Sequence, residues 1–152
     1  MDYLFQFEQD KYYALRRIPM AMRIKLDLAG YKLSIRDWSK FSRPDREALA
    51  AMAYETDEQL HAFRTRVKAL VAAIQGDSTE MPPCPRPAPW EITEHVPEPT
   101  RELIAAQGAA PPTVAQWAAF SPLQRYALVK LTRPGAKNEK LPAALREFGL
   151  LA

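Results

Sequence analysis

The pattern of hydrophobic and polar residues is ambiguous in the stretch MRIKLDLAGYKLSIRDW, residues 22–38. Apolar residues from Met22 to Leu28 alternate with polar ones, and the alternation resumes at Tyr31, which is the pattern of a β-hairpin. The same residues also fit a buried helix that ends at a glycine C-cap, Gly30. Periodicity by itself favours the hairpin, so a second observation has to decide between the two structures.

A similar segment recurs later in the chain and becomes visible when Trp38 is aligned with Trp117. The first copy contains RIKLDLAG and YKLSIRDWSKFSRPDREALAAM, which correspond to RELIAAQG and AAPPTVAQWAAFSPLQRYALVKL in the second. We therefore predict two repeats, at about residues 17–54 and 97–132, related by a pseudo-twofold axis. A chance similarity is the alternative explanation.

The second copy favours the helix, because TRELIAAQG is rich in helix formers and ends in a glycine. We therefore predict a buried helix at residues 20–28, begun by Pro19 in its first turn and ended by Gly30. Short extended pieces follow the two glycines, at residues 32–35 and 112–114. We predict that these pieces pair as a two-stranded ribbon between the repeats.

Further helices are predicted from their first turns, where serine or threonine is followed three residues later by aspartate or glutamine. Such signals begin at Ser42, Thr56 and Ser121. The proline-dense stretch 76–99 cannot hold a long helix and is predicted to connect the two repeats. The remaining predicted helices span about residues 43–54, 56–74, 122–132 and 142–148.

Length and composition are those of one globular domain, residues 1–152, of the mainly all-α class. Apolar residues make up 47% of the chain and charged residues 26%, as in ordinary soluble proteins. The acidic N-terminus shows no secretory signal, and no apolar run approaches the roughly 18 residues that span a membrane. We expect a cytoplasmic protein without membrane contact. We also expect a monomer, because two repeats can bury the core between them.

Residues with catalytic or metal-binding chemistry are few and scattered. His61 and His95 lie far apart without further ligands at metal spacing, and the five glycines form no phosphate-binding loop. We therefore expect no metal site, no cofactor, no catalytic residue and no enzymatic activity. Two roles stay open: Cys84 could be reactive if exposed, and Trp90 could anchor either the proline-dense connection or a partner.

Residues 16–46, which we call the basic segment, carry nine basic side chains and only three aspartates. Such a segment can bind an acidic protein, a phosphate-bearing cofactor or nucleic acid. An ordinary solvated surface is the alternative, and nucleic acid is disfavoured because no DNA-binding helix pair or stacking surface accompanies the charge. The candidate partner-binding residues are Arg16, Arg17, Arg23, Lys25, Lys32, Arg36 and Lys40.

Three stretches of the chain resemble a known family. They are FQFEQDKYYALRRIPMAMRIKLDLAGYKLSIRDWSKFS near the start, WAAFSPLQRYALVKLTRP, and the closing LPAALREFGL. They resemble the nitrate reductase-associated proteins of cyanobacteria and proteobacteria, the NarM-like family. The resemblance extends from Phe5 to Leu150, and its middle part fits mainly in length and character. The motif positions, which we expect to be structural, are Pro19, Gly30, Trp38, Phe41, Trp117, Arg125, Arg133, Pro134 and Gly149.

Members of that family tend to be encoded beside assimilatory nitrate reductase and molybdenum-cofactor genes. The resemblance therefore implies a non-catalytic accessory protein that binds the reductase or its molybdenum-cofactor machinery. Its role would be in maturation, stability or cofactor insertion. The alternative is a regulatory binding module of nitrogen metabolism, whose basic face meets an acidic protein or nucleic acid. A second rival is an enzyme or pterin carrier, for which the sequence offers no pocket-forming signature.

Overall fold

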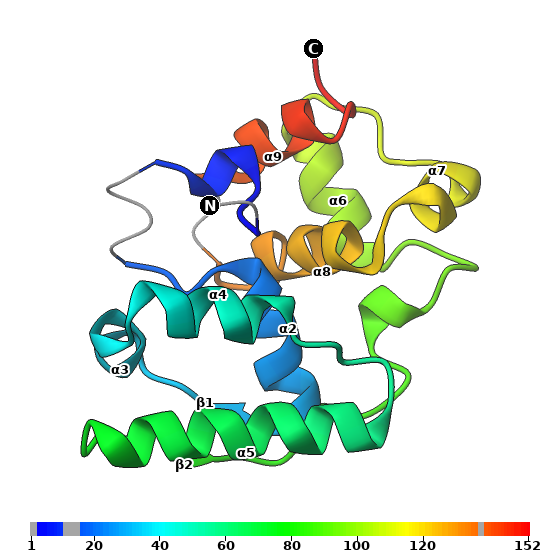
Figure 1. Ribbon diagram of the computed structural model, residues 1–152. Coiled ribbons are helices and arrows are strands. Elements are labelled where there is room, and N and C mark those ends of the chain that lie inside the picture. The colour runs from blue at the N-terminus through cyan, green and yellow to red at the C-terminus, as the bar shows by residue number, and fades with distance from the viewer. Residues whose placement is uncertain (1–2, 11–15, 137–138) are drawn as a thin grey trace. The chain divides into compact units, whose positions relative to one another are not determined.

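The computed structural model describes residues 3–10, 16–136 and 139–152, and it is mainly helical (Figure 1). The prediction of a mainly all-α fold is confirmed. The chain divides into two compact units, Met1–Pro85 and Arg86–Ala152, and each is described by itself below. The predicted single domain and the predicted duplication remain predictions. Residues 11–15 of the first family-like stretch lie outside the described ranges.

The elements of the two units follow one another along the chain with short connections. The first unit contains η1 (Gln6–Glu8), α2 (Met20–Ala29), β1 (Tyr31–Lys32), α3 (Ile35–Lys40), α4 (Arg43–Ala51), α5 (Asp57–Ala73) and β2 (Thr79–Glu80). The second unit contains η2 (Pro89–Glu91), α6 (Glu98–Ala106), α7 (Val114–Ala119), α8 (Pro122–Leu131) and α9 (Leu141–Glu147).

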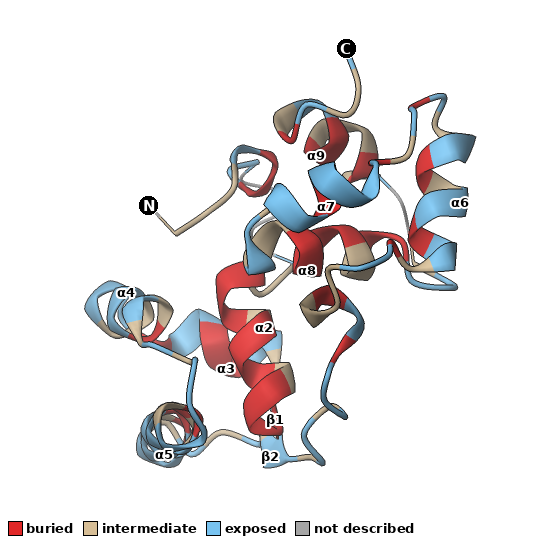
Figure 2. Ribbon diagram, turned by 90° about the vertical axis from the view of Figure 1, so that its right-hand side faces the viewer, coloured by how far each residue is buried: buried red, intermediate tan, exposed pale blue. Residues whose placement is uncertain are grey.

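Helix α2 forms the centre of the first unit and packs against α4 and α5. Most of its residues are buried, as the red ribbon in Figure 2 shows. The predicted helix is confirmed and the hairpin interpretation is wrong. Pro19 is the N-cap of α2 and precedes its first turn, while Gly30 ends the helix in the left-handed region, at a φ of 80°. A glycine adopts this conformation without the steric cost of a Cβ atom.

Glycine is also required at position 30 because another backbone segment, residues 81–84, passes close to it. The segment after β2 crosses the end of α2, where the Met81 amide donates to the Gly30 carbonyl and the Cys84 amide to the Asp27 carbonyl, both at 2.9 Å. A Cβ atom on Gly30 would lie 2.5 Å from the Met81 carbonyl oxygen and 2.9 Å from the Pro83 nitrogen. The end of α2 and the segment 81–84 therefore fit together only with glycine at this position.

The prediction that the extended pieces 32–35 and 112–114 pair with each other is wrong. β1 pairs antiparallel with β2, so that Tyr31 lies opposite Glu80 and Lys32 opposite Thr79, within the first unit. The extended pieces are short because helices α3 and α7 begin inside the ranges predicted to be extended. Ser34 accepts a hydrogen bond from the Asp37 amide, and Thr113 accepts one from the Gln116 amide, each at 3.1 Å. Both residues are N-caps, and a six-residue helix follows each of them, beginning at the last residue of the predicted extended piece.

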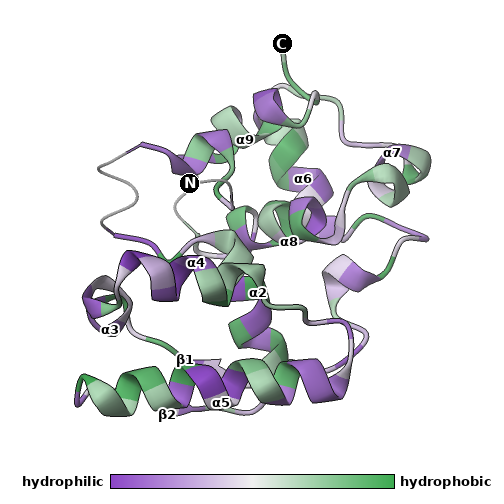
Figure 3. Cartoon of the chain, in the orientation of Figure 1, coloured by the Kyte–Doolittle hydropathy of each residue, from purple (hydrophilic) through white to green (hydrophobic). Residues whose placement is uncertain are grey.

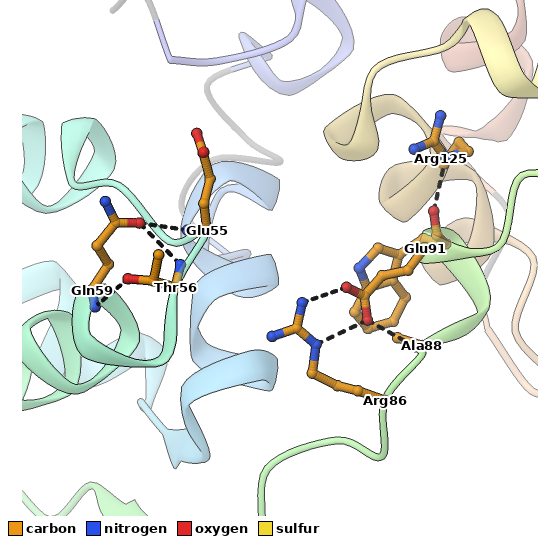
Figure 4. A network of polar contacts seen from close by, with 8 residues as sticks. Glu55, Thr56, Gln59, Arg86, Ala88, Glu91 and Arg125 are labelled. Atoms are coloured by element: carbon orange, nitrogen blue, oxygen red, sulfur yellow. Dashed lines mark hydrogen bonds and ion pairs between the residues drawn. The ribbon is translucent and has the colours of Figure 1, made fainter.

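The helices predicted from serine and threonine caps are present. Ser42, Thr56 and Ser121 each accept a hydrogen bond from the backbone amide three residues later, at 3.1–3.2 Å. Thr56 and Gln59 form a full capping box, drawn at the left of Figure 4. The helix that follows, α5, alternates hydrophilic and hydrophobic residues along its length (Figure 3). Its buried residues are Leu60, Phe63, Val67 and Val71.

Lys25 points into the core of the first unit and is 2% exposed. Its ammonium group donates to the carbonyls of Leu49 at 2.7 Å and Ala50 at 2.6 Å, in the last turn of α4. The rings of Tyr54 and Phe63 lie 5.8 and 5.5 Å from the same nitrogen. Lys25 therefore caps the C-terminus of α4, where carbonyls lack helical partners and a positive charge is favoured. Burial lowers the pKa of Lys25 from 10.5 to about 8.

Asp37 joins α3 to the turn that follows α5. Its buried carboxylate accepts the Ser78 amide at 3.0 Å and the Ser78 hydroxyl. Burial raises the pKa of Asp37, but the hydrogen bonds from Ser78 outweigh it and hold the pKa below its ordinary value. Gly76 leaves room for this carboxylate, because a Cβ atom there would overlap it.

In the second unit, Arg125 of α8 connects the elements around it. Its Nε atom donates to the Trp90 carbonyl at 2.8 Å (Figure 4), and its Nη1 atom donates to the Phe120 carbonyl at the end of α7. The Trp90 ring is buried and meets the Tyr126 ring edge-on, with 4.7 Å between the ring centroids. Trp90 thus anchors the proline-dense connection to α8 and is not an exposed anchor for a partner.

The predicted connection between the repeats is not entirely irregular. It contains β2 and η2, and α6 begins inside it. Beside η2, Arg86 pairs with Glu91 at 2.6 Å, and the Glu91 carboxylate also accepts the Ala88 amide at 2.8 Å (Figure 4). The hydrogen bond from Arg86 holds the pKa of Glu91 below its ordinary value, against the opposing effect of partial burial.

Replacing Gly30 by alanine should destabilise the protein more than the same change at Gly108. Both glycines have nearly the same positive φ, 80° and 79°, but a Cβ atom on Gly108 would meet nothing within 4 Å. We expect a loss of about 1 kcal/mol for Gly108→Ala from backbone strain, and about 3 kcal/mol for Gly30→Ala, where the added atom also displaces the segment 81–84. Urea unfolding followed by circular dichroism measures both losses, and equal losses would contradict the close approach at Gly30.

The buried amine of Lys25 should make stability rise with pH. The folded protein releases this proton at about pH 8, whereas an ordinary lysine releases it at 10.5, so between these values the unfolded chain binds more protons. Below about pH 8 both states are protonated and the contribution is constant. We expect the free energy of unfolding of the native protein, minus that of Lys25→Met, to increase by about 3 kcal/mol across this range. A difference that stays flat or falls with pH would show that the lysine is hydrated.

Candidate partner-binding surface

The basic segment forms one side of an open pocket of about 250 Å³ in the first unit. Four of the predicted partner-binding residues line it: Arg16, Arg17, Arg23 and Lys32. Arg16 and Arg17 precede α2, Arg23 lies in α2, and Lys32 lies in β1. The turn at Gly30 reverses the chain between α2 and β1, and this brings Lys32 into the same pocket as Arg23.

The rest of the pocket lining is mainly apolar. Ile35 is of particular interest, because it is 37% exposed and is one of two large hydrophobic residues so exposed in the described part of the chain. The other is Val114, which does not line this pocket. One carboxylate, Asp27, lies one helical turn after Arg23 and also lines the pocket. The apolar lining residues are Ile18, Leu26, Tyr31, Leu33, Ile35 and Met81. We call the whole set the basic–apolar pocket.

Among the described residues, two of the cations in the pocket have no acidic partner. Within the described ranges, neither Arg23 nor Lys32 has a carboxylate oxygen within 4.0 Å. The Arg23 guanidinium contacts the Met20 sulfur at 3.7 Å. Arg17 donates to the Arg16 carbonyl at 3.0 Å. The positive charges of Arg23 and Lys32 are therefore available to an external carboxylate or phosphate.

The predicted set of partner-binding residues does not form one surface. Lys25 is buried against the end of α4, so the prediction that it belongs to a partner-binding surface is wrong. Residues two apart on a helix point about 200° away from each other, and Arg23 and Lys25 are separated in this way. Arg36 and Lys40 are exposed on α3 but do not line the pocket.

The apolar half of the pocket is not predictable from the sequence pattern. Met81 reaches it only because β2 pairs with β1, and a strand of two residues leaves no periodic signal in the sequence. Ile35 was assigned to an extended piece, although the N-cap signal at Ser34 and Asp37 marks it as the first residue of a helix. That signal could have identified Ile35 as a residue at the start of a helix, where exposure is common.

The lining favours recognition of an anion next to an apolar group. Guanidinium groups bind carboxylates and phosphates through two parallel hydrogen bonds and remain charged at all physiological pH values. The volume of about 250 Å³ lies below the roughly 300–1,000 Å³ of sites that enclose whole ligands. The pocket is therefore of a size for one side chain or a small anion.

The residues considered for metal chemistry are dispersed. His61 and His95 are both exposed, and Nδ1 of His61 lies 3.5 Å from Nη2 of Arg64. Among the residues that the structure describes, no three histidine, cysteine or acidic side chains are grouped so that they could hold a metal ion. None of the described helices combines the length and the apolar character needed to cross a membrane.

Most family-motif positions have a visible role in packing or in chain reversal. Trp38 and Phe41 are buried, with their rings edge to face at 6.1 Å, and Trp117 donates from its indole nitrogen to the Ile92 carbonyl at 2.8 Å. Gly149 follows α9 with a φ of 79°. Arg133 and Pro134 are exposed after α8, and no packing contact explains their place in the motif.

Comparison with known proteins identifies the family. No curated protein and no solved structure matches the chain. One family model, described as conserved nitrate reductase-associated protein, matches residues 4–148. The match covers nearly all of the 152 residues and includes both units. The chain therefore belongs to the family of conserved nitrate reductase-associated proteins.

Proposed function

We propose that the protein is a non-catalytic accessory protein of assimilatory nitrate reductase, and that it acts by binding the reductase or its molybdenum-cofactor machinery. Membership of a nitrate reductase-associated family supports the association. Maturation, stabilisation and cofactor insertion are the steps that such binding would assist. We expect it to act as a cytoplasmic monomer.

The proposal is supported by one observation: two cations that have no acidic partner in the described part of the chain lie beside an exposed aliphatic side chain. Arg23, Lys32 and Ile35 line the same pocket, and Arg16 and Arg17 add further positive charge. Arginine side chains suit protein recognition, because they stay protonated and form directional hydrogen bonds with carboxylates. Complementary charge on the partner would speed association and select the correct partner, and both effects weaken as salt screens the charges.

The basic–apolar pocket contains only some of the residues that the sequence predicts to bind the partner. The cations in the lining are Arg16, Arg17, Arg23 and Lys32, whereas Arg36 and Lys40 lie outside it and Lys25 is buried. We therefore place the reductase contact at the pocket. Because the pocket is too small to enclose a whole cofactor, its occupant would be a part of the partner protein.

Reversing the charges in the pocket should abolish capture of the reductase. The variant carries Arg16→Glu, Arg17→Glu and Arg23→Glu, and we expect at least about a tenfold loss of reductase recovered with the tagged protein from nitrate-grown host cells. The measurement is affinity purification with quantitative mass spectrometry, with and without a block in cofactor supply.

The matched control carries Arg36→Glu, Lys40→Glu and Arg66→Glu, which reverse exposed cations outside the pocket lining of the same unit. Its recovery of the reductase should stay near that of the native protein. Equal losses in the two variants would mean that overall charge, and not the pocket, governs binding. If the native protein recovers no reductase or cofactor-synthesis enzyme under either condition, the proposed function is wrong. Recovery of nucleic acid or regulatory proteins instead would favour the alternative of a regulatory module.

A further inference from the structure

The basic–apolar pocket has two chemically different halves. Arg23 and Lys32 provide charge without an acidic partner in the described ranges, and the exposed Ile35 with the half-buried Ile18 and Met81 provides an apolar surface. An inorganic anion would satisfy the first half and leave Ile35 exposed to water. A purely apolar group would cover Ile35 and bury cations next to it without partners, which is costly. An occupant with both characters satisfies the whole lining.

The volume sets the size of the apolar group. A cavity of about 150 Å³ lined by aliphatic side chains holds a benzene molecule. The basic–apolar pocket, at about 250 Å³, therefore has room for one leucine- or phenylalanine-sized side chain with its adjoining backbone. One group of that size fills most of this volume, so we assign the apolar contact to one residue of the occupant.

The balance of charge favours a peptide over a polyanion. Four basic side chains and one carboxylate, Asp27, line the pocket. Asp27 lies one helical turn from Arg23, so it repels a dense run of phosphates while leaving room for separate carboxylates at Arg23 and Lys32. Tyr31, the aromatic residue in the lining, is 3% exposed and offers no open face on which a nucleic-acid base could stack.

We propose that the basic–apolar pocket binds a short acidic segment of the partner protein that carries one large apolar residue. The apolar side chain lies against Ile35, Ile18 and Met81, and flanking carboxylates pair with Arg23 and Lys32. This inference rests on the proposed function, since it describes the part of the partner that the pocket recognises. It also specifies a sequence character that can be tested without the reductase.

The test uses two synthetic probes and the full-length protein. One probe is a short peptide of glutamates around a central leucine, and the other has serine in place of the leucine. Binding is measured by fluorescence anisotropy over a range of salt concentrations. We expect the leucine probe to bind at least about fivefold more tightly than the serine probe, as is typical when one anchoring side chain is removed. Inorganic phosphate alone should not displace either probe at millimolar concentration.

Matched variants test the apolar half and the charged half of the pocket separately. Ile35→Ser should abolish the preference for the leucine probe, whereas Val114→Ser should keep it. Ile35 and Val114 are the first residues of six-residue helices and are both exposed, but only Ile35 lines the pocket. Lys32→Glu should lower the affinity for both probes by about tenfold and make that affinity less dependent on salt. Arg36→Glu, in the neighbouring helix, should leave the affinity and its salt dependence unchanged.

Several results would overturn the inference. These are a lack of binding by both probes, equal affinity for the two probes, or equal effects of Ile35→Ser and Val114→Ser. Displacement by phosphate with no effect of Ile35→Ser would identify a simple anion site instead. The proposed function fails separately: selective probe binding without any recovery of the reductase would disprove the accessory role while leaving the pocket's preference intact. Recovery of the reductase that does not change with Ile35→Ser would disprove the inference alone.

Discussion

Where α2 ends, the chain reverses at Gly30 while the segment 81–84 packs against the same stretch of backbone. A side chain at this point would disturb both features. The reversal leads α2 into β1, and the pairing of β1 with β2 then brings Met81 to the pocket. The helical conformation of residues 20–29 also determines which charged side chains reach the surface. A strand would have placed Arg23 and Lys25 on one face, whereas the helix directs Arg23 to the pocket and Lys25 into the core.

Local signals predicted much of the fold, and the failures occurred where contacts between distant residues decide the structure. Glycine at the end of α2 and hydroxyl caps at Ser42, Thr56 and Ser121 act within a few residues, so the sequence reveals them. The partner of β1 depends on a segment nearly fifty residues away, Thr79–Glu80, which has no pattern of its own. The helices α3 and α7 escaped prediction although Ser34 and Thr113 carry the same kind of cap. The positive half of the candidate site was predictable from composition, but its apolar half was not.

The helices of the two units follow a similar order. Within the described ranges, each unit has a 3₁₀ helix, an α-helix, a six-residue helix and a serine-capped helix in this order, with β1 inserted in the first unit. An arginine contact also recurs: Arg46 donates to the Ser39 carbonyl at 2.7 Å, and Arg125 donates to the Ala118 carbonyl at 3.4 Å. These parallels are what a duplication would leave, and the duplication itself stays a prediction. The units differ in what they add, because α5 and the strand pair belong to the first and α9 to the second.

The three tryptophans are distributed unevenly between the units, with Trp38 in the first and Trp90 and Trp117 in the second, and all three are buried. Their intrinsic fluorescence therefore reports on both halves of the chain in one combined signal. With phenylalanine in place of two of them, the remaining indole follows one unit alone. Superimposable denaturation curves from Trp38 and from Trp117 would reveal one cooperative transition, and displaced curves would reveal two halves that melt independently.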